Sequence, residues 1–388
     1  MNLSLDYYVQ ALQERASQDN LRSLRASRPL PYGQIELSGK ELVNFASNDY
    51  LGLSQDLTLI ARANEYAQRY GVGSGSSRLL SGNLQVFEKI ENKLARLKGT
   101  EAALILPTGF QANSSVIPAI VDKKSVAAAD RLIHRSMAEG LLLSSARWFR
   151  FAHNDFRDME ERLKRFDLQT GARWLITESV FSADGDWVDI DALLALAKRL
   201  GLALFVDEAH ATGLFGLNGM GLTAGKSIPG ISMGTFGKGL GSFGAYVCCS
   251  NTMRDYLINF CPGLIYSTAL PPPVLGAIDA ALDLVPEMDL KRQELQDKAE
   301  RLRVSLKSMG FDTGLSTTHI IPIIVGSAGS ALSLSSYLEK SGFYVPAIRP
   351  PTVPNGSARL RLSLTAVHTN HQIENFLSTL RNWHEEKH

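Results

Sequence analysis

The chain has 388 residues, of which 45% are hydrophobic, so it is long enough to bury a large core and to form more than one domain. Its 40 basic and 39 acidic residues give a formal net charge of +1, which argues against nucleic acid as a partner. The three cysteines fit neither a paired disulfide framework nor a C-x-x-C metal motif and are typical of a reducing compartment. The sequence has no signal-peptide pattern at its start and no apolar run of about 20 residues, so we expect a cytoplasmic protein without a membrane partner.

The first segment, residues 1–48, is expected to hold one helix and two short strands. The hydrophobic pattern predicts the helix over residues 5–25 and the strands over 34–37 and 41–45. The pattern leaves open whether this segment packs beside the C-terminal part of the chain.

Residues 49–283 are expected to form a large domain, because short apolar strands alternate there with helices. Strands are predicted at 102–106, 126–129, 148–151, 174–177, 202–206 and 244–249, and helices at 86–97, from 109, and at 134–144, 159–166 and 190–200. This alternation is typical of an α/β domain with a mostly parallel sheet flanked by helices. Ligands of such sheets bind beyond the carboxyl ends of the strands, so functional residues are expected directly after strands.

Residues 284–388 have a different pattern, which predicts a smaller α+β domain. A long charged helix is expected at 288–309, followed by a strand at 320–325, a helix at 331–340, strands near 344–348 and 359–364, and a last helix from 372.

Three short motifs resemble known sites only in their letters. The G-x-G-x-x-G at 239–244 is followed by a predicted strand, whereas the dinucleotide fingerprint requires a helix there. The D-E-A-H at 207–210 has no phosphate-binding loop to accompany it. The H-E-x-x-H at 384–388 lies in a polar chain end, so no metal site is expected.

A lysine and an aspartate carry the most informative chemistry. Lys238 lies between glycines after a short apolar stretch, where its amine can approach a ligand and form a Schiff base. Asp207 ends a predicted buried strand, and an aspartate there can keep a pyridinium nitrogen protonated, as pyridoxal phosphate (PLP) requires. His210 is a candidate contact for the phenolic oxygen of PLP. Each residue alone also fits a plainer role: a solvated lysine, a turn cap and a buried, hydrogen-bonded histidine.

The turn Pro107-Thr108-Gly109-Phe110 joins a predicted strand to a predicted helix upstream of both residues. Free N–H groups at that helix N-terminus would bind the phosphate of PLP, although an ordinary turn fits the same residues. A phosphate-binding turn, a strand-end aspartate and a glycine-flanked lysine follow one another in the order of the aspartate-aminotransferase-like PLP enzymes.

Over nearly its whole length the chain resembles one family of that class, the α-oxoamine synthases. The segments that carry the resemblance are 44–53, 71–78 and 177–186, together with the stretches around Asp207 and Lys238. The resemblance implies a PLP-dependent transferase of fold type I, with a large domain and a smaller C-terminal α+β domain.

Carried over position by position, the resemblance implies a set of site residues. The catalytic residues would be Lys238, His134, Asp207 and His210. The cofactor would be bound by Gly109, Phe110, Ser182, Asp207, His210, Thr235 and Lys238, with Ser267 and Thr268 reaching the site of the neighbouring subunit. The substrates would be bound by Asn48, Arg361, Thr352, Arg349 and Arg22. Plainer roles remain for four of these residues. His134 can start a helix, Asn48 can form a turn, Arg361 can be an edge-strand charge and Arg22 can lie at a solvated helix end.

The family resemblance implies a decarboxylative condensation of an amino acid with an acyl thioester, in a homodimer with shared active sites. The segments 347–354 and 360–365 look most like members that join L-alanine to a pimeloyl thioester, of CoA or of acyl carrier protein, for biotin synthesis. Members that use glycine with acetyl-CoA, or serine, or another acyl chain remain alternatives. A non-catalytic subunit that binds an acyl thioester or a protein is a further alternative, and the presence of Lys238, Asp207 and His210 argues against it.

Overall fold

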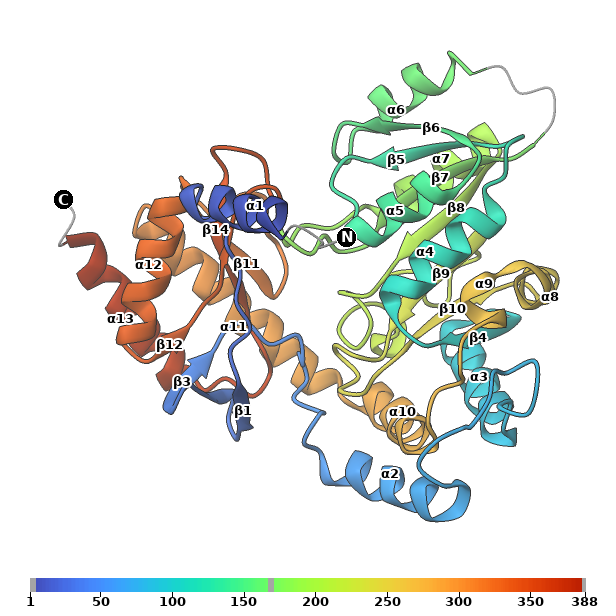
Figure 1. Ribbon diagram of the computed structural model, residues 1–388, viewed down its shortest axis with the longest axis horizontal. Coiled ribbons are helices and arrows are strands. Elements are labelled where there is room, and N and C mark those ends of the chain that lie inside the picture. The colour runs from blue at the N-terminus through green and yellow to red at the C-terminus, as the bar shows by residue number, and fades with distance from the viewer. Residues whose placement is uncertain (1–4, 167–170, 386–388) are drawn as a thin grey trace. The chain divides into compact units, whose positions relative to one another are not determined.

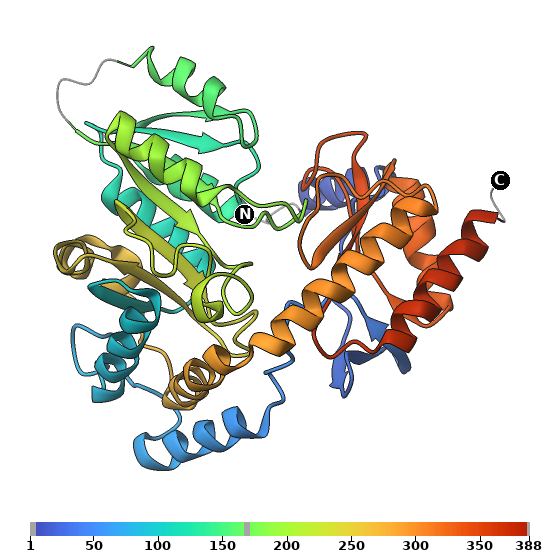
Figure 2. The ribbon, with the colours of Figure 1, turned by 180° about the vertical axis from the view of Figure 1, so that it is seen from behind.

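The computed structural model describes residues 5–166 and 171–385, in two compact units (Figures 1 and 2). Within these described ranges, the small unit comprises residues 5–47, 183–185 and 295–385, and the large unit comprises 48–166, 171–182 and 186–294. The H-E-x-x-H motif at 384–388 lies mostly outside the described residues, which end at Glu385. No helix in the described ranges is both long and apolar enough to cross a bilayer.

The large unit is built on a seven-stranded sheet. Its strands, in spatial order, are β4 (Ala102–Leu106), β10 (Ala245–Cys249), β9 (Gly230–Thr235), β8 (Leu202–Asp207), β7 (Arg173–Glu178), β5 (Val126–Asp130) and β6 (Arg147–Phe151). All neighbours pair in parallel except β10, which runs antiparallel to both β4 and β9. The prediction of an α/β fold with a mostly parallel sheet is confirmed.

Helices cover both faces of this sheet, which explains why its strands are apolar on both sides. One face packs against α4 (Gly109–Ile120), α5 (Arg135–Leu143), α8 (Asn251–Phe260) and α9 (Pro262–Ile265). The other face packs against α6 (Phe156–Leu163) and α7 (Ile190–Leu200). The helices α2 (Leu57–Tyr70), α3 (Gln85–Lys98) and α10 (Pro272–Leu284) pack together beside β4.

The interior of the large unit contains all three cysteines of the chain. Cys248 and Cys249 lie on β10, and Cys261 lies between α8 and α9. Burial raises the pKa of the Cys248 and Cys249 thiols to about 12 and also raises the pKa of Cys261.

The carboxyl ends of neighbouring strands bring the candidate residues to one edge of the sheet. Asp130, Glu178, Asp207 and Thr235 are the last residues of β5, β7, β8 and β9. Gly109 opens α4 shortly after β4 ends. This edge is the place where parallel α/β sheets bind ligands.

The small unit contains two sheets. The first has the order β1 (Ser27–Leu30), β2 (Gln34–Leu37), β3 (Lys40–Asn44) and β12 (Phe343–Tyr344), and the second β11 (Ile320–Gly326), β14 (Ala358–Ser363) and β13 (Ala347–Ile348). Its helices are α1 (Asp6–Ser17), α12 (Ala328–Lys340), α13 (Asn370–Glu385) and the part of α11 (Asp289–Ser308) from Leu295 onward. Because β3 pairs in parallel with β12, the N-terminal segment packs with C-terminal residues.

The sequence prediction for the first helix is wrong in length. The helix α1 ends at Ser17, and residues 18–26 form no helix, although a helix was expected to residue 25. Asp19 adopts a left-handed backbone with φ of 55°, and the N–H of Asn20 donates to the carbonyl of Arg15, which closes the helix. Aspartate and asparagine favour such turns over helix interiors. The strands β1 and β9 and the helices α2, α8, α9 and α10 were not predicted.

Candidate active site

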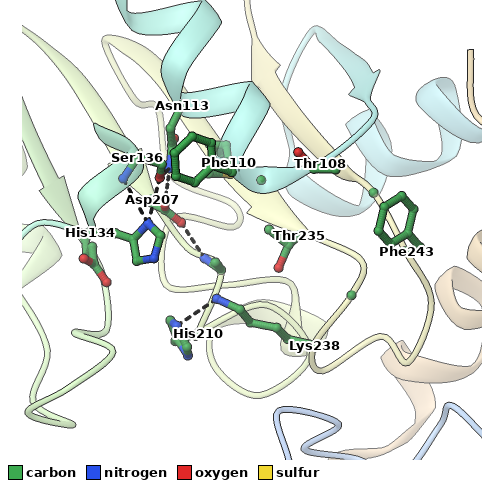
Figure 3. A pocket seen from close by; sticks show the side chains of 16 residues that line it. Thr108, Phe110, Asn113, His134, Ser136, Asp207, His210, Thr235, Lys238 and Phe243 are labelled. Carbon is green, nitrogen blue, oxygen red and sulfur yellow. Dashed lines mark hydrogen bonds between the residues drawn. The ribbon is translucent and has the colours of Figure 1, made fainter. Parts of the chain in front are cut away.

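A cavity of about 310 Å³ lies at the carboxyl edge of the large sheet (Figure 3). The residues predicted from the sequence that line it are Gly109, Phe110, His134, Asp207, His210, Thr235 and Lys238. Further lining residues are Thr108, Asn113, Ser136, Glu178, Ala209, Met233, Gly237, Phe243 and Gly244.

Lys238 lies on the loop between β9 and β10. The loop is closed by hydrogen bonds from Phe236 N to Gly244 O, 2.9 Å, and from Gly241 N to Lys238 O, 2.9 Å. A side chain at Gly239 would put its Cβ 2.4 Å from the carbonyl oxygen of Thr212. The glycine beside the lysine therefore lets this loop pack directly on the turn that follows β8.

The amine of Lys238 begins a chain of hydrogen bonds. Its Nζ lies 2.8 Å from Nε2 of His210, and Nδ1 of His210 lies 2.6 Å from Oη of Tyr50. Tyr50 Oη in turn donates to Oδ1 of Asn48 at 3.0 Å. With Lys238 protonated, its ammonium can only donate, so Nε2 accepts and the proton of His210 is on Nδ1. That assignment gives each of these groups a matched donor or acceptor.

Asp207 is held in place by two donors. Its carboxylate accepts a hydrogen bond from the N–H of Ala209 and another from Nδ2 of Asn113, both at 2.8 Å. The side chain is buried beneath the cavity, where donors of this kind stabilise a negative charge.

His134 both caps a helix and faces the cavity. Its Nδ1 accepts from the N–H of Ser136 at 3.3 Å, as the cap of α5, and lies 2.7 Å from the Ser136 hydroxyl. Nδ2 of Asn113 donates to that hydroxyl at 3.0 Å, which links His134 to the residue that holds Asp207. Burial lowers the pKa of His134, although the charge of Asp207 acts in the opposite direction. The ring is therefore neutral at pH 7, with its proton on Nε2.

The start of α4 and the end of β9 form a candidate anion site. The first N–H groups of α4, at Gly109 and Phe110, have no acceptor within the helix. The Thr235 hydroxyl is buried and has no hydrogen-bond partner within 5–166 and 171–385. A Cβ at Gly109 would lie 2.6 Å from Cγ2 of Thr235, so glycine is needed for this close approach. Helix N–H groups and an unsatisfied hydroxyl fit the phosphate of PLP.

Glu178 lines the cavity and was not predicted as a site residue. It is the register partner of Asp207 on the neighbouring strand, so the two acidic side chains lie on the same face of the sheet. Burial raises the pKa of Glu178 well above its usual range, and the charge of Asp207 raises it further. Its Oε1 has no hydrogen-bond partner in the described part of the chain.

Three predicted cofactor contacts do not line this cavity. Ser182 lies in the loop after β7. Ser267 accepts a hydrogen bond from the side-chain amide of Gln111, in the first turn of α4, and Thr268 forms a β-bridge with Ser77. The role of Ser267 and Thr268 in a neighbouring subunit stays a prediction.

The small unit contains the remaining predicted substrate residues. Nη2 of Arg22 donates to the Thr352 hydroxyl at 3.1 Å, and the guanidinium of Arg349 donates to the carbonyl oxygen of Asp19. These contacts bring Arg22, Arg349 and Thr352 into one neighbourhood. Arg361 lies on β14 and donates to the Ser363 hydroxyl at 2.7 Å.

Sequence reasoning did not identify Tyr50, Asn113, Ser136 or Glu178 as site residues. Asn113 lies one helical turn after Gly109, so its position on the same face of a helix was a usable signal. Glu178 lies beside Asp207 only because β7 pairs with β8. Sequence patterns do not specify this pairing.

Comparison with known proteins places the chain in a family. The family model of the class I and II aminotransferases matches residues 40–380. A relative from Gluconacetobacter diazotrophicus, named 8-amino-7-oxononanoate synthase, is 47% identical over 353 residues, which cover 89% of each chain. A relative from Desulfosudis oleivorans, given the same name provisionally, is 49% identical over 380 residues, 98% of each chain.

The fold is also similar to that of a solved enzyme. A structure of serine palmitoyltransferase with PLP has a TM-score of 0.90 and is 27% identical, over 97% of this chain and 96% of the other. The matches confirm the family and the fold class that the sequence predicted.

Proposed function

We propose, from the premise that this chain belongs to the α-oxoamine synthases of the class I and II aminotransferase family, that it joins L-alanine to a pimeloyl thioester with loss of CO2. The product would be 8-amino-7-oxononanoate, as the names of its relatives suggest. The observation that carries the proposal is the cavity in which the Lys238 amine, the Asp207 carboxylate and the orphaned Thr235 hydroxyl meet.

PLP is the cofactor that these residues fit. When bound, PLP supplies an electron sink for the electron pair that a substrate Cα–H bond leaves behind. Lys238 would hold the cofactor through its amine, and Asp207 would hold its pyridine nitrogen. Thr235 and the N–H groups of Gly109 and Phe110 would hold its phosphate.

The protein groups around the cavity would manage the protons of the reaction. Lys238 Nζ would remove the proton from the substrate Cα, and its hydrogen bond to His210 Nε2 orients that nitrogen. His134, held neutral by Ser136 and by burial, would cover the cofactor face and exclude water. Arg361 and Asn48 would bind the carboxylate of the amino acid.

The acyl substrate is proposed from the relatives and from the residues of the small unit. Two guanidinium groups, of Arg22 and Arg349, and the Thr352 hydroxyl provide donors for an anionic group of the acyl thioester. The thioester would be of CoA or of acyl carrier protein. We expect a homodimer, with Ser267 and Thr268 contributing to the neighbouring site.

The experiment is a spectral titration of the purified protein with PLP. Wild type is compared with Lys238→Ala and with Lys123→Ala, a control at an exposed lysine. L-alanine, glycine and L-serine are added separately, followed by pimeloyl-CoA, and the product is identified by mass spectrometry. We expect wild type and the control to show the visible band of lysine-bound PLP, which L-alanine shifts, and Lys238→Ala to lack this lysine-bound band.

Two results would contradict parts of the proposal. A shift by glycine or L-serine and not by L-alanine would overturn the substrate assignment and keep the family chemistry. A wild-type protein without any PLP band would overturn the role of Lys238, and the acyl-thioester-binding subunit would then be the better interpretation.

A further inference from the structure

A partly buried histidine outside the cavity, His153, lies between two carboxylates. Its Nδ1 is 3.0 Å from both carboxylate oxygens of Asp130, and its Nε2 is 2.7 Å from Oδ2 of Asp186. Its side chain is 9% exposed, so the contacts are shielded from water. Both ring nitrogens face an acceptor, and only the doubly protonated ring can donate to both.

The first carboxylate, Asp130, organises the loop that leads to His134. It is the last residue of β5, and Oδ1 accepts from the N–H of Leu132 at 2.8 Å. Oδ2 accepts from the N–H of Asn154 at 2.8 Å. Loop 130–134 is therefore shaped by the same carboxylate that binds His153, and it ends at the histidine that faces the cavity.

The second carboxylate, Asp186, closes the loop after β7 that carries Ser182. The N–H of Phe181 donates to the Asp186 carbonyl at 2.9 Å, and Val180 forms a β-bridge with Trp187. The Phe181 ring packs edge-on against His153, with ring centroids 4.3 Å apart. His153 thus contacts Phe181 and Asp186, the two residues whose backbone hydrogen bond closes this loop.

The two loops converge on the cavity. Burial raises the pKa of Glu178, which lines the cavity, and the backbone N–H groups of His134 and Ser182 act against this rise, so both loops lie close to its carboxyl group. A displacement of either loop would therefore move a predicted cofactor contact together with an N–H group that acts on Glu178.

We propose that His153 is a positioning residue of the active site, whose cationic ring joins loop 130–134 to loop 179–188 and so fixes His134 and Ser182 around the cofactor. The inference rests on the proposed function for its PLP site. His153 itself does not line the cavity, so it acts through the residues it positions.

The charge of His153 defines the pH range of this contact. Burial alone would lower the pKa of His153, but Asp130 and Asp186 outweigh it and raise the pKa to about 9. The charged groups that face the ring within the described ranges are these two carboxylates, from β5 and from the loop after β7, beside the neutral Asn154 and Phe181. A histidine with a raised folded pKa stabilises the fold below its unfolded pKa, and this stabilisation is lost as the pH rises through about 9.

The test compares holoenzymes of wild type, His153→Gln and His371→Gln, a control at an exposed histidine of α13. Visible circular dichroism of bound PLP, divided by its absorbance, reports the orientation of the cofactor between pH 7 and 10. We expect the wild-type and control signals to change with a midpoint near pH 9, and His153→Gln to show the high-pH signal throughout. We also expect kcat of His153→Gln to fall about tenfold, which is less than the roughly 100-fold that a 1 Å misplacement can cost, because His153 acts through the loops it joins.

A second measurement separates a positioning role from a purely structural one. The unfolding free energy of the apoprotein, measured between pH 6 and 10, tests the contact without PLP. If His153→Gln changes only this stability profile and leaves the dichroism and its pH dependence as in wild type, the positioning role is overturned. A wild-type protein that binds no PLP would instead overturn the proposed function.

Asp186→Asn tests the same proposal if His153→Gln does not fold. This variant keeps an oxygen acceptor for His153 and removes one negative charge, so the midpoint of the dichroism change should move below that of wild type. An unchanged midpoint in Asp186→Asn would overturn the proposal.

Discussion

Tyr50 and His210, 160 positions apart in the sequence, are joined by a hydrogen bond of 2.6 Å between Oη and Nδ1. The other ring nitrogen of His210 faces the amine of Lys238, so Tyr50 sets which nitrogen is available to the lysine. The proposed proton chemistry at Lys238 therefore depends on a hydroxyl that does not line the cavity.

Tyr50→Phe removes the oxygen that receives the Nδ1 hydrogen bond. We expect kcat to fall about tenfold, because the loss of a buried hydrogen-bond partner costs about 1–3 kcal/mol. Steady-state kinetics with L-alanine and pimeloyl-CoA measure the change, with the exposed Tyr32→Phe as control. Equal kcat values for the two variants would show that Tyr50 does not orient His210.

Glu178→Gln tests the protonation of the second carboxyl group beside Asp207. Because the folded-state pKa of Glu178 is raised, the stability that it contributes is complete below its unfolded pKa and is lost as the pH rises toward the folded pKa. The amide cannot ionise, so the variant should gain stability relative to wild type between pH 5 and 8. Urea unfolding of the apoproteins measures this gain, and the exposed Glu161→Gln should follow wild type. If the unfolding free energies of Glu178→Gln and wild type differ by the same amount at every pH, the raised pKa of Glu178 is contradicted.

Asp279→Asn tests a charge cluster between α2, α3 and α10. Burial alone would raise the pKa of Asp279, but hydrogen bonds from Lys93, Lys89 and Tyr66 hold it well below its ordinary range. A carboxylate of this kind stabilises the fold above its unfolded pKa, and the stabilisation is lost as the pH falls. We expect the variant to lose about 2–3 kcal/mol at pH 7, discounted because Lys89 is largely exposed, and this loss to become smaller as the pH falls below about 4 toward the folded-state pKa of Asp279.

The control for Asp279→Asn is Asp255→Asn, at a largely exposed carboxylate that pairs with Arg254. It should change the unfolding free energy by less than about 1 kcal/mol. A loss in Asp279→Asn that is the same at pH 3 and pH 7 would point to packing and not to charge.

Lys98→Met leaves a carboxylate in the protein interior without its cation. Lys98 and Glu208 are both fully buried and form an ion pair, and Lys98 Nζ also donates to the Thr223 hydroxyl at 2.9 Å. We expect Lys98→Met to lower the unfolding free energy by about 3–5 kcal/mol. The double variant Lys98→Met with Glu208→Gln should recover part of this loss, because the remaining group is neutral. A double variant less stable than Lys98→Met would contradict the charge explanation.

Much of the large unit could be predicted from the sequence because its strands are apolar and its turns carry clear signals. The helix α7 has the predicted bounds, and Asp207 ends β8 as its strand-end position indicated. The order of Gly109, Asp207 and Lys238 predicted that the three residues lie close together, because the carboxyl ends of parallel strands meet at one edge of the sheet. All three line the cavity.

The remaining features depend on which elements become neighbours. Burial raises the pKa of Glu178, and Asp207 raises it further because β7 lies beside β8, a pairing that no local pattern specifies. His153 follows β6 at the end of the sheet and meets Asp186 only through the folded loop after β7. The length of α1 was mispredicted because the left-handed turn at Asp19 stops a helix whose composition would allow it to continue.

The burial of the three cysteines has a practical consequence for labelling. Cys248, Cys249 and Cys261 are inaccessible and their raised pKa values leave very little thiolate at neutral pH. A cysteine introduced at an exposed position such as Lys123 would be the fast-reacting thiol, without removal of the native ones. The native chain is thus already a suitable background for attaching a fluorophore or a spin label at one chosen site.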